Sequence, residues 1–91
     1  MSVEKMWFVY IIQTVCGKLY TGISTDIERR FNEHLDVHQG RGIKGAKFFR
    51  GHKPSIILYS EKCLNRSAAS KRECQIKSMT VTQKKRLIAL K

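Results

Sequence analysis

Residues 8–34 of the sequence, FVYIIQTVCGKLYTGISTDIERRFNEH, gather tyrosine, arginine and histidine side chains in one short segment. Tyr10 and Tyr20 lie in two strand-like runs that are separated by a glycine turn. Arg30 and His34 follow on a stretch with helical periodicity. These side chains can orient a nucleophile and hold a phosphate. Because the strands could fold without them, the segment indicates chemistry on nucleic acid rather than packing alone.

Arg30 and His34 are predicted to lie one helical turn apart, about 40° around the axis at roughly 100° per residue. Both border the apolar stripe of that helix, which is predicted to consist of Ile27, Phe31 and Leu35. Their side chains could therefore run along the sheet rather than out to solvent. The spacing alone equally fits a helix-surface pair without a function.

Tyr10 and Tyr20 are expected on adjacent antiparallel strands. If the turn keeps them on one face, they share with Gly22 the surface that faces Arg30. Two aromatic residues on strands often simply pack against each other. Glycine weakens a strand and often lets a ligand or another backbone approach closely, so Gly22 is predicted to line a phosphate-binding surface.

Glu73 is a carboxylate inside the apolar stripe of a later helix, four residues after Ala69 and three before Ile76. Burying a carboxylate is costly unless it is paired or binds a cation. Arg72 or Lys77 could pair with it, which gives a structural interpretation. The alternative is a metal ligand, because one carboxylate completed by waters and substrate phosphates is a normal Mg²⁺ arrangement. The residues alone leave both interpretations open.

A glycine-rich basic loop is predicted between these two helices, since residues 37–60 contain no Asp or Glu. Basic side chains spaced by glycines can follow a phosphate backbone. Phe48 and Phe49 could stack on bases, although we expect one of the two to be a core residue. The predicted nucleic-acid contacts in this loop are Arg41, Lys44, Lys47, Arg50 and Lys53.

Length and charge limit the class of protein. The 91 residues predict a single domain over 1–91, and the apolar share of 42% is that of a globular protein. The net charge of +11, from 18 Lys and Arg against 7 Asp and Glu, favours a polyanionic partner, although a basic solvated surface would also explain it.

Cysteine usage and hydropathy indicate the compartment. The cysteines are three, an odd number, and none of them has metal-finger spacing, so we expect free thiols in a reducing cytoplasm. No apolar run approaches the ~20 residues of a membrane span, so no membrane association is expected.

The elements that must position these residues can be read from the same sequence. Residues 7–12 are apolar on both faces, which predicts a central strand, with a returning strand over 18–23 and a third over 55–59. Residues with capping side chains mark the starts of three helices. The candidate caps are Thr25 with Glu28, Asn65 or Ser67, and Thr80 with Gln83. The order strand, strand, helix, strand, helix, helix predicts a small α+β fold, a three-stranded antiparallel sheet flanked by helices.

Taken together, these residues resemble the GIY-YIG nuclease superfamily, and most of all its small stand-alone bacterial domain proteins, the YhbQ-like group. The family's first tripeptide is represented by FVY, which ends at Tyr10, and the second by YTG, from Tyr20 to Gly22. Arg30 and His34 follow in order. The segments GAKFFRG and KRECQIK match the remainder, so the resemblance covers nearly the whole chain.

The resemblance implies a role for each candidate residue. Tyr20 would act as the base, or relay to the base, that activates water, and Tyr10 would orient that water. Arg30 would neutralise charge on the scissile phosphate. His34 would take part in proton transfer or hold the hydrogen bonds of the site. Glu73 would hold one Mg²⁺ or Mn²⁺ ion.

The function that the resemblance implies is metal-dependent endonuclease cleavage of nucleic acid, DNA rather than RNA, in repair or processing. A non-catalytic basic nucleic-acid-binding module, or an adaptor with an acidic protein partner, is the alternative on the same scaffold. The catalytic residues favour the enzyme, because a binding module has no need for a carboxylate that repels phosphate. Larger relatives choose substrates through additional domains, so a protein partner could supply specificity here.

Overall fold

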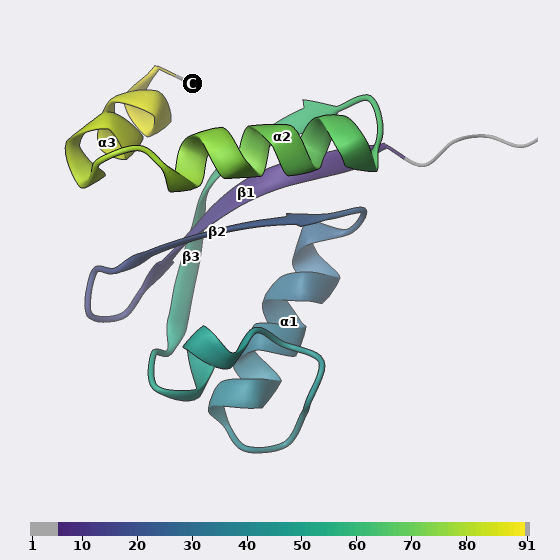
Figure 1. Cartoon of the computed structure of the whole chain (residues 1–91). Helices are drawn as coiled ribbons and strands as arrows, with labels where there is room; N and C mark the ends of the chain where they lie inside the picture. The colour runs from purple at the N-terminus through teal and green to yellow at the C-terminus, as the bar shows by residue number, and fades with distance from the viewer. Residues whose placement is uncertain (1–5, 91) are drawn as a thin grey trace, which may run out of the picture.

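The computed structural model describes residues 6–90, in which one antiparallel sheet is flanked by helices (Figure 1). The predicted α+β class and element order are confirmed. A short 3₁₀ helix inside the basic loop was not predicted. In chain order the elements are β1 (Trp7–Thr14), β2 (Leu19–Ser24), α1 (Ile27–His38), η1 (Lys47–Arg50), β3 (Pro54–Cys63), α2 (Arg66–Lys77) and α3 (Val81–Ala89).

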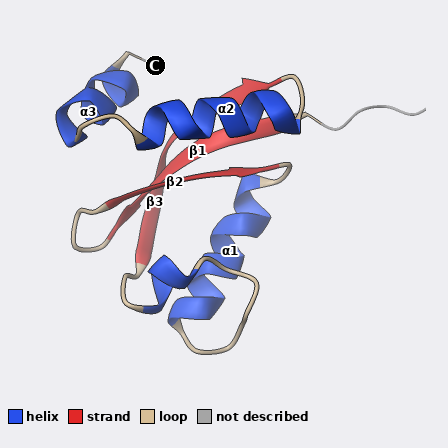
Figure 2. Ribbon diagram, viewed as in Figure 1, coloured by secondary structure: helices blue, strands red, loops and turns tan. Residues whose placement is uncertain are grey.

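The sheet has the order β2-β1-β3, so β1 is the central strand, as its two apolar faces predicted. Val9 and Ile11 are buried on the side of α2, and Tyr10 and Ile12 are buried on the side of η1. The ribbon in Figure 2 shows α1 and α2 on opposite sides of the sheet. Full burial of one such aliphatic side chain contributes about 1.5–3 kcal/mol, so β1 anchors both layers. The third strand extends beyond the predicted 55–59 because it pairs with β1 along almost its whole length.

The helix caps are set by short-range hydrogen bonds. Asn65 accepts from the backbone N–H of Ala68 and caps α2, and the predicted capping box of α3 is present. The cap of α1 was predicted wrongly: it is Asp26, not Thr25. The Ser24 hydroxyl binds both the N–H and the carbonyl of Asp26 and holds this residue in the extended capping conformation. Among the helices of residues 6–90, none has the length and apolar character needed to cross a lipid bilayer.

The buried face of α1 differs from the predicted stripe. Its fully or nearly buried residues are His34 and Val37, whereas Ile27 and Phe31 are partly buried. The difference arises because the segment after α1 folds back and packs η1 against the helix, which buries His34 at the border of the predicted stripe. Phe49 of η1 has no exposed surface, and this confirms that one of the two phenylalanines belongs to the core.

Candidate active site

The side chain of Tyr10 lies at the centre of the candidate site and crosses from β1 over the neighbouring strand. Tyr10 pairs with Gly22 in the β1–β2 register and is only 1% exposed. A Cβ atom on Gly22 would lie 2.4 Å from the Tyr10 hydroxyl oxygen. The structure therefore does not support the predicted phosphate contact of Gly22. The room left by this buried glycine is filled by the Tyr10 ring rather than by a ligand.

Replacing Gly22 with alanine should displace Tyr10 and destabilise the fold. Because the clash falls on a buried ring, we expect a loss of about 1–3 kcal/mol in the free energy of unfolding. Gly51→Ala is the matched control, since a Cβ there meets no atom within 4 Å. Chemical denaturation of both variants measures the effect. Equal stability of the two proteins would show that Tyr10 has another rotamer available.

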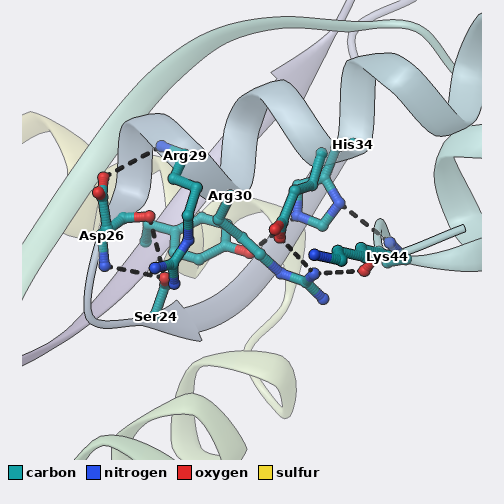
Figure 3. Close-up of polar contacts among 9 residues, drawn as sticks. Ser24, Asp26, Arg29, Arg30, His34 and Lys44 are labelled. Carbon is teal, nitrogen blue, oxygen red and sulfur yellow. Dashed lines mark hydrogen bonds and ion pairs between the residues drawn. The ribbon is translucent and has the colours of Figure 1, made fainter. Parts of the chain in front are cut away.

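His34 reaches Tyr10 from α1 and is fully buried. Its Nδ1 atom accepts a hydrogen bond from the backbone N–H of Ala46, at 3.0 Å (Figure 3). The proton of the neutral ring must then lie on Nε2, which donates to the Tyr10 hydroxyl oxygen at 2.9 Å. The hydroxyl proton of Tyr10 is consequently left free for donation to another group.

The loop that supplies the Ala46 amide lies directly on α1. A Cβ on Gly45 would come within 2.5 Å of the Glu33 carbonyl oxygen and 2.8 Å of the His34 Cα atom. Only glycine permits this approach, so Gly45 is part of the support for the His34 ring. From the sequence, Gly45 was only one of the glycines that space the basic residues of the predicted loop.

Burial controls the charge state of both residues. Burial and, less strongly, the positive charge of Arg30 together lower the pKa of His34 to about 4, although the negative charge of Glu33 opposes them. Burial also raises the pKa of Tyr10 well above its ordinary value; the nearby Tyr20 and, less strongly, Glu73 act in the same direction, and Arg30 opposes them. At neutral pH the imidazole is therefore uncharged and Tyr10 is a protonated hydrogen-bond donor.

The low pKa of His34 predicts a loss of stability in mild acid. Between the ordinary value of 6.5 and about 4, the unfolded chain binds a proton at this residue that the folded protein does not. The contribution of neutral His34 to the free energy of unfolding is therefore complete above pH 6.5. This contribution, about 2–4 kcal/mol, is lost as the pH falls towards 4. Denaturation series across this range should give a flatter profile for His34→Gln than for the wild type. The control His38→Gln should keep the wild-type slope; identical slopes for all three proteins would contradict the assignment.

Arg30 is held on the same side of the site by two groups. Its Nη1 atom donates to the Glu33 carboxylate at 3.0 Å and to the backbone carbonyl of Lys44, as Figure 3 shows. Its positive charge also lies close enough to the Tyr10 hydroxyl to lower the pKa of that group, against the effect of burial. Glu33 was not identified from the sequence, although its spacing of three residues from Arg30 was an available signal. These contacts orient one edge of the guanidinium and leave its other donors for a ligand.

Tyr20 is half-buried, and its ring packs among aromatic side chains beside Tyr10. The centroid distances are 4.8 Å to Phe49, 5.4 Å to Phe48 and 5.4 Å to the His34 ring. On the side of α2, the Lys77 ammonium nitrogen lies 6.0 Å from the Tyr20 centroid. Sequence reasoning treated Lys77 only as an ion-pair partner, because its approach to Tyr20 depends on how α2 crosses the sheet.

Glu73 comes to the site from α2. Its side chain is 23% exposed, and one carboxylate oxygen lies 3.4 Å from the ammonium of Lys77, which is itself 53% exposed. The other candidate partner, Arg72, binds Glu61 instead. The predicted ion pair between Lys77 and Glu73 is thus present. An exposed pair of this kind stabilises the fold by only about 0.3–0.5 kcal/mol and separates easily.

The donor set at Glu73 fits a hard divalent cation that takes few ligands from the protein. No group of three or more His, Cys, Asp and Glu side chains forms a metal cluster within residues 6–90. An ion at Glu73 would therefore complete its coordination with water and substrate phosphate oxygens, an arrangement that Mg²⁺ readily adopts.

The predicted basic contacts have exposed side chains. They belong to the loop after α1, to η1 and to the segment between η1 and β3. Lys44 takes part in the site only through its backbone carbonyl, which accepts from Arg30. The exposed side chains are those of Arg41, Lys44, Lys47, Arg50 and Lys53.

Comparisons with known proteins agree with this geometry. Residues 6–86 match the model of the GIY-YIG catalytic domain. A UPF0213 protein of Desulfotalea psychrophila is 46% identical over 82 residues, which cover 90% of this chain and 70% of that protein. The UPF0213 protein YhbQ of Escherichia coli K12 is 42% identical over 83 residues, 91% of this chain and 77% of that protein. The solution NMR structure of a UPF0213 protein from Bacillus halodurans superposes with a TM-score of 0.58 at 31% identity, covering 94% of this chain and 85% of that chain.

Proposed function

Because the chain belongs to the family of GIY-YIG catalytic domains, we propose that it is a metal-dependent endonuclease that hydrolyses phosphodiester bonds, in DNA rather than RNA. The observation that carries the proposal is the hydrogen bond between His34 and the Tyr10 hydroxyl, with the charges of Arg30 and Glu73 close enough to act on that hydroxyl. A structural core has no need of this set of donors and a carboxylate. The net charge of +11 favours the same polyanionic substrate.

In this mechanism Tyr10 is a donor and Tyr20 is the base. Tyr10 accepts from His34 and directs its own proton at the attacking water or at a phosphate oxygen. Its raised pKa makes it a poor base, which leaves Tyr20 to remove or relay the proton of the water. His34 acts as a positioning residue, because its ring is buried and both of its nitrogens are already engaged.

Arg30 stabilises the charge that develops on the scissile phosphate, and its hydrogen bonds to Glu33 and to the Lys44 carbonyl fix it before substrate arrives. Glu73 would hold one Mg²⁺ or Mn²⁺ ion, which would supply Lewis-acid stabilisation of the negative charge on the phosphate. The Lys77 ammonium is exposed and could separate from Glu73 to leave the carboxylate free for the ion. The exposed basic loop would contact the phosphate backbone outside the site.

We place the protein in the cytoplasm, with repair or processing of DNA as its role and a protein partner as a source of specificity. The activity is tested with branched, nicked, single-stranded and duplex substrates, each with Mg²⁺, with Mn²⁺ and with EDTA. We expect cleavage of at least one substrate with a divalent ion and none with EDTA. An Arg30→Ala protein purified in parallel reveals contaminating nuclease. Salt-dependent binding without cleavage of any substrate would instead identify a binding module.

A further inference from the structure

A second hollow lies beside the Tyr10 site, where the starts of α1 and α2 approach the end of β2. Its volume is about 350 Å³, within the range of small-ligand pockets. Arg30 and Glu33 line it, so it is continuous with the proposed catalytic residues. The other side chains that could recognise a ligand there are Trp7, Arg29 and Arg66. Of the site residues predicted from the sequence, Arg30 alone lines this pocket.

The pocket is positively charged because two of its arginines are not neutralised. Glu33 is paired with Arg30, whereas no carboxylate within residues 6–90 forms an ion pair with Arg29 or Arg66. The first turn of α2, which begins at Arg66, contains no acidic residue and adds its partial positive charge. Guanidinium groups that are exposed and unpaired at the rim of a hollow favour a phosphate group.

Trp7 gives the pocket a flat, stackable wall. The guanidinium carbon of Arg66 lies 5.6 Å from the centroid of the Trp7 ring, so the two groups form a cation–π layer. Nucleobases stack on indole rings and on the planes of arginine guanidinium groups. Phosphate donors and a stacking wall in one hollow are complementary to a nucleotide rather than to phosphate alone.

We propose that this pocket holds one unpaired nucleotide of the substrate strand, next to the scissile phosphate. Arg29 and Arg66 bind its phosphate, and its base stacks on the layer formed by Arg66 and Trp7. The nucleotide is unpaired because a base inside a duplex is stacked on both sides and cannot enter the hollow. The inference rests on the proposed function for the position of the scissile phosphate, which Arg30 links to the pocket.

Trp7 is the single tryptophan of the sequence, so its fluorescence reports directly on the pocket. The wild-type protein is titrated in EDTA, which separates binding from cleavage, with a short single-stranded oligothymidylate. We expect saturable quenching of Trp7 by this strand. An abasic strand of the same length and charge should quench much less, and so should the same oligothymidylate annealed to its complement.

Variants of the pocket residues test which side chains contact the strand. The fluorescence anisotropy of a labelled strand measures binding. Arg29→Ala and Arg66→Ala should each weaken binding of the oligothymidylate about tenfold. The control Arg86→Ala removes the same charge from α3, outside the pocket, and should change affinity much less. Trp7→Phe should lower the preference for the base-containing strand over the abasic one.

The outcomes separate this inference from the proposed function. Equal quenching by abasic and base-containing strands, or equal losses in all three arginine variants, would overturn the nucleotide pocket even if the protein cleaves DNA. Base-dependent quenching in a protein that cleaves no substrate would support the pocket and refute the nuclease.

Discussion

Replacing Glu73 with glutamine should abolish metal-dependent cleavage while leaving the fold and most of the binding intact. The substitution keeps the size of the side chain and removes the charge that would hold the ion. Because Lewis-acid stabilisation is worth several kcal/mol, we expect the rate to fall by roughly 10²–10³ or more. Single-turnover cleavage with saturating Mg²⁺ or Mn²⁺ measures the loss.

Lys77→Met is the matched control, because it breaks the same ion pair without removing the carboxylate. If Glu73 serves only that pair, both variants should behave alike, with small changes in thermal stability and equal activity. If Glu73 is the ligand, Mg²⁺ should protect the wild type and Lys77→Met from thermal unfolding, but not Glu73→Gln. Normal cleavage by Glu73→Gln would remove the metal assignment.

Tyr20→Phe should cause a comparable loss of rate, because it removes the hydroxyl that we propose takes or relays the proton of the attacking water. General-base catalysis contributes about 10²–10⁴ in rate. The ring contacts with Phe48, Phe49 and His34 should survive, so we expect an unchanged folded spectrum and melting temperature. The wild-type rate should rise with pH, and this dependence should disappear in the variant.

Tyr10→Phe should differ from Tyr20→Phe, because loss of the Tyr10 hydroxyl should lower stability as well as rate. Loss of the Tyr10 hydroxyl leaves the Nε2–H group of His34 buried without its acceptor, which costs about 1–3 kcal/mol of stability. Tyr10→Phe should therefore lower both stability and rate, with a smaller loss of rate than Tyr20→Phe because Tyr10 only positions the water. A Tyr20→Phe protein that cleaves every substrate as fast as wild type would make Tyr20 a packing residue.

Local features of the sequence were sufficient to predict the three strands and the three α-helices, although not the 3₁₀ helix η1. The two apolar faces of residues 7–12 required cover on both sides, and β1 is the central strand of the sheet. Asn65 and the pair Thr80 and Gln83 cap helices as predicted, because a cap bonds to an amide only two or three residues away. The cap at Asp26 was missed by one residue, since the deciding contact comes from Ser24 on the preceding strand.

The residue types that can do chemistry were also readable from the sequence, as ordered tyrosines, an arginine, a histidine and a carboxylate. Their charge states and hydrogen-bond partners were not. His34 is neutral and has a defined tautomer because Ala46, twelve residues further along the chain, folds back to donate to it. Gly22 makes room for a tyrosine on the neighbouring strand rather than for a ligand.

The pocket beside the Tyr10 site shows most clearly the difference between what the sequence determines and what the tertiary structure determines. Trp7, Arg29 and Arg66 belong to a strand and two helices that are far apart in the chain, and no spacing in the sequence connects them. Caps and periodic faces depend on neighbours within one or two turns, so the sequence by itself determined the strands, most helix starts and the candidate catalytic residues. The burial of the site residues, the tautomer of His34 and the shape of the pocket depend on contacts that form only when separate elements pack together. The tertiary structure alone decided these features.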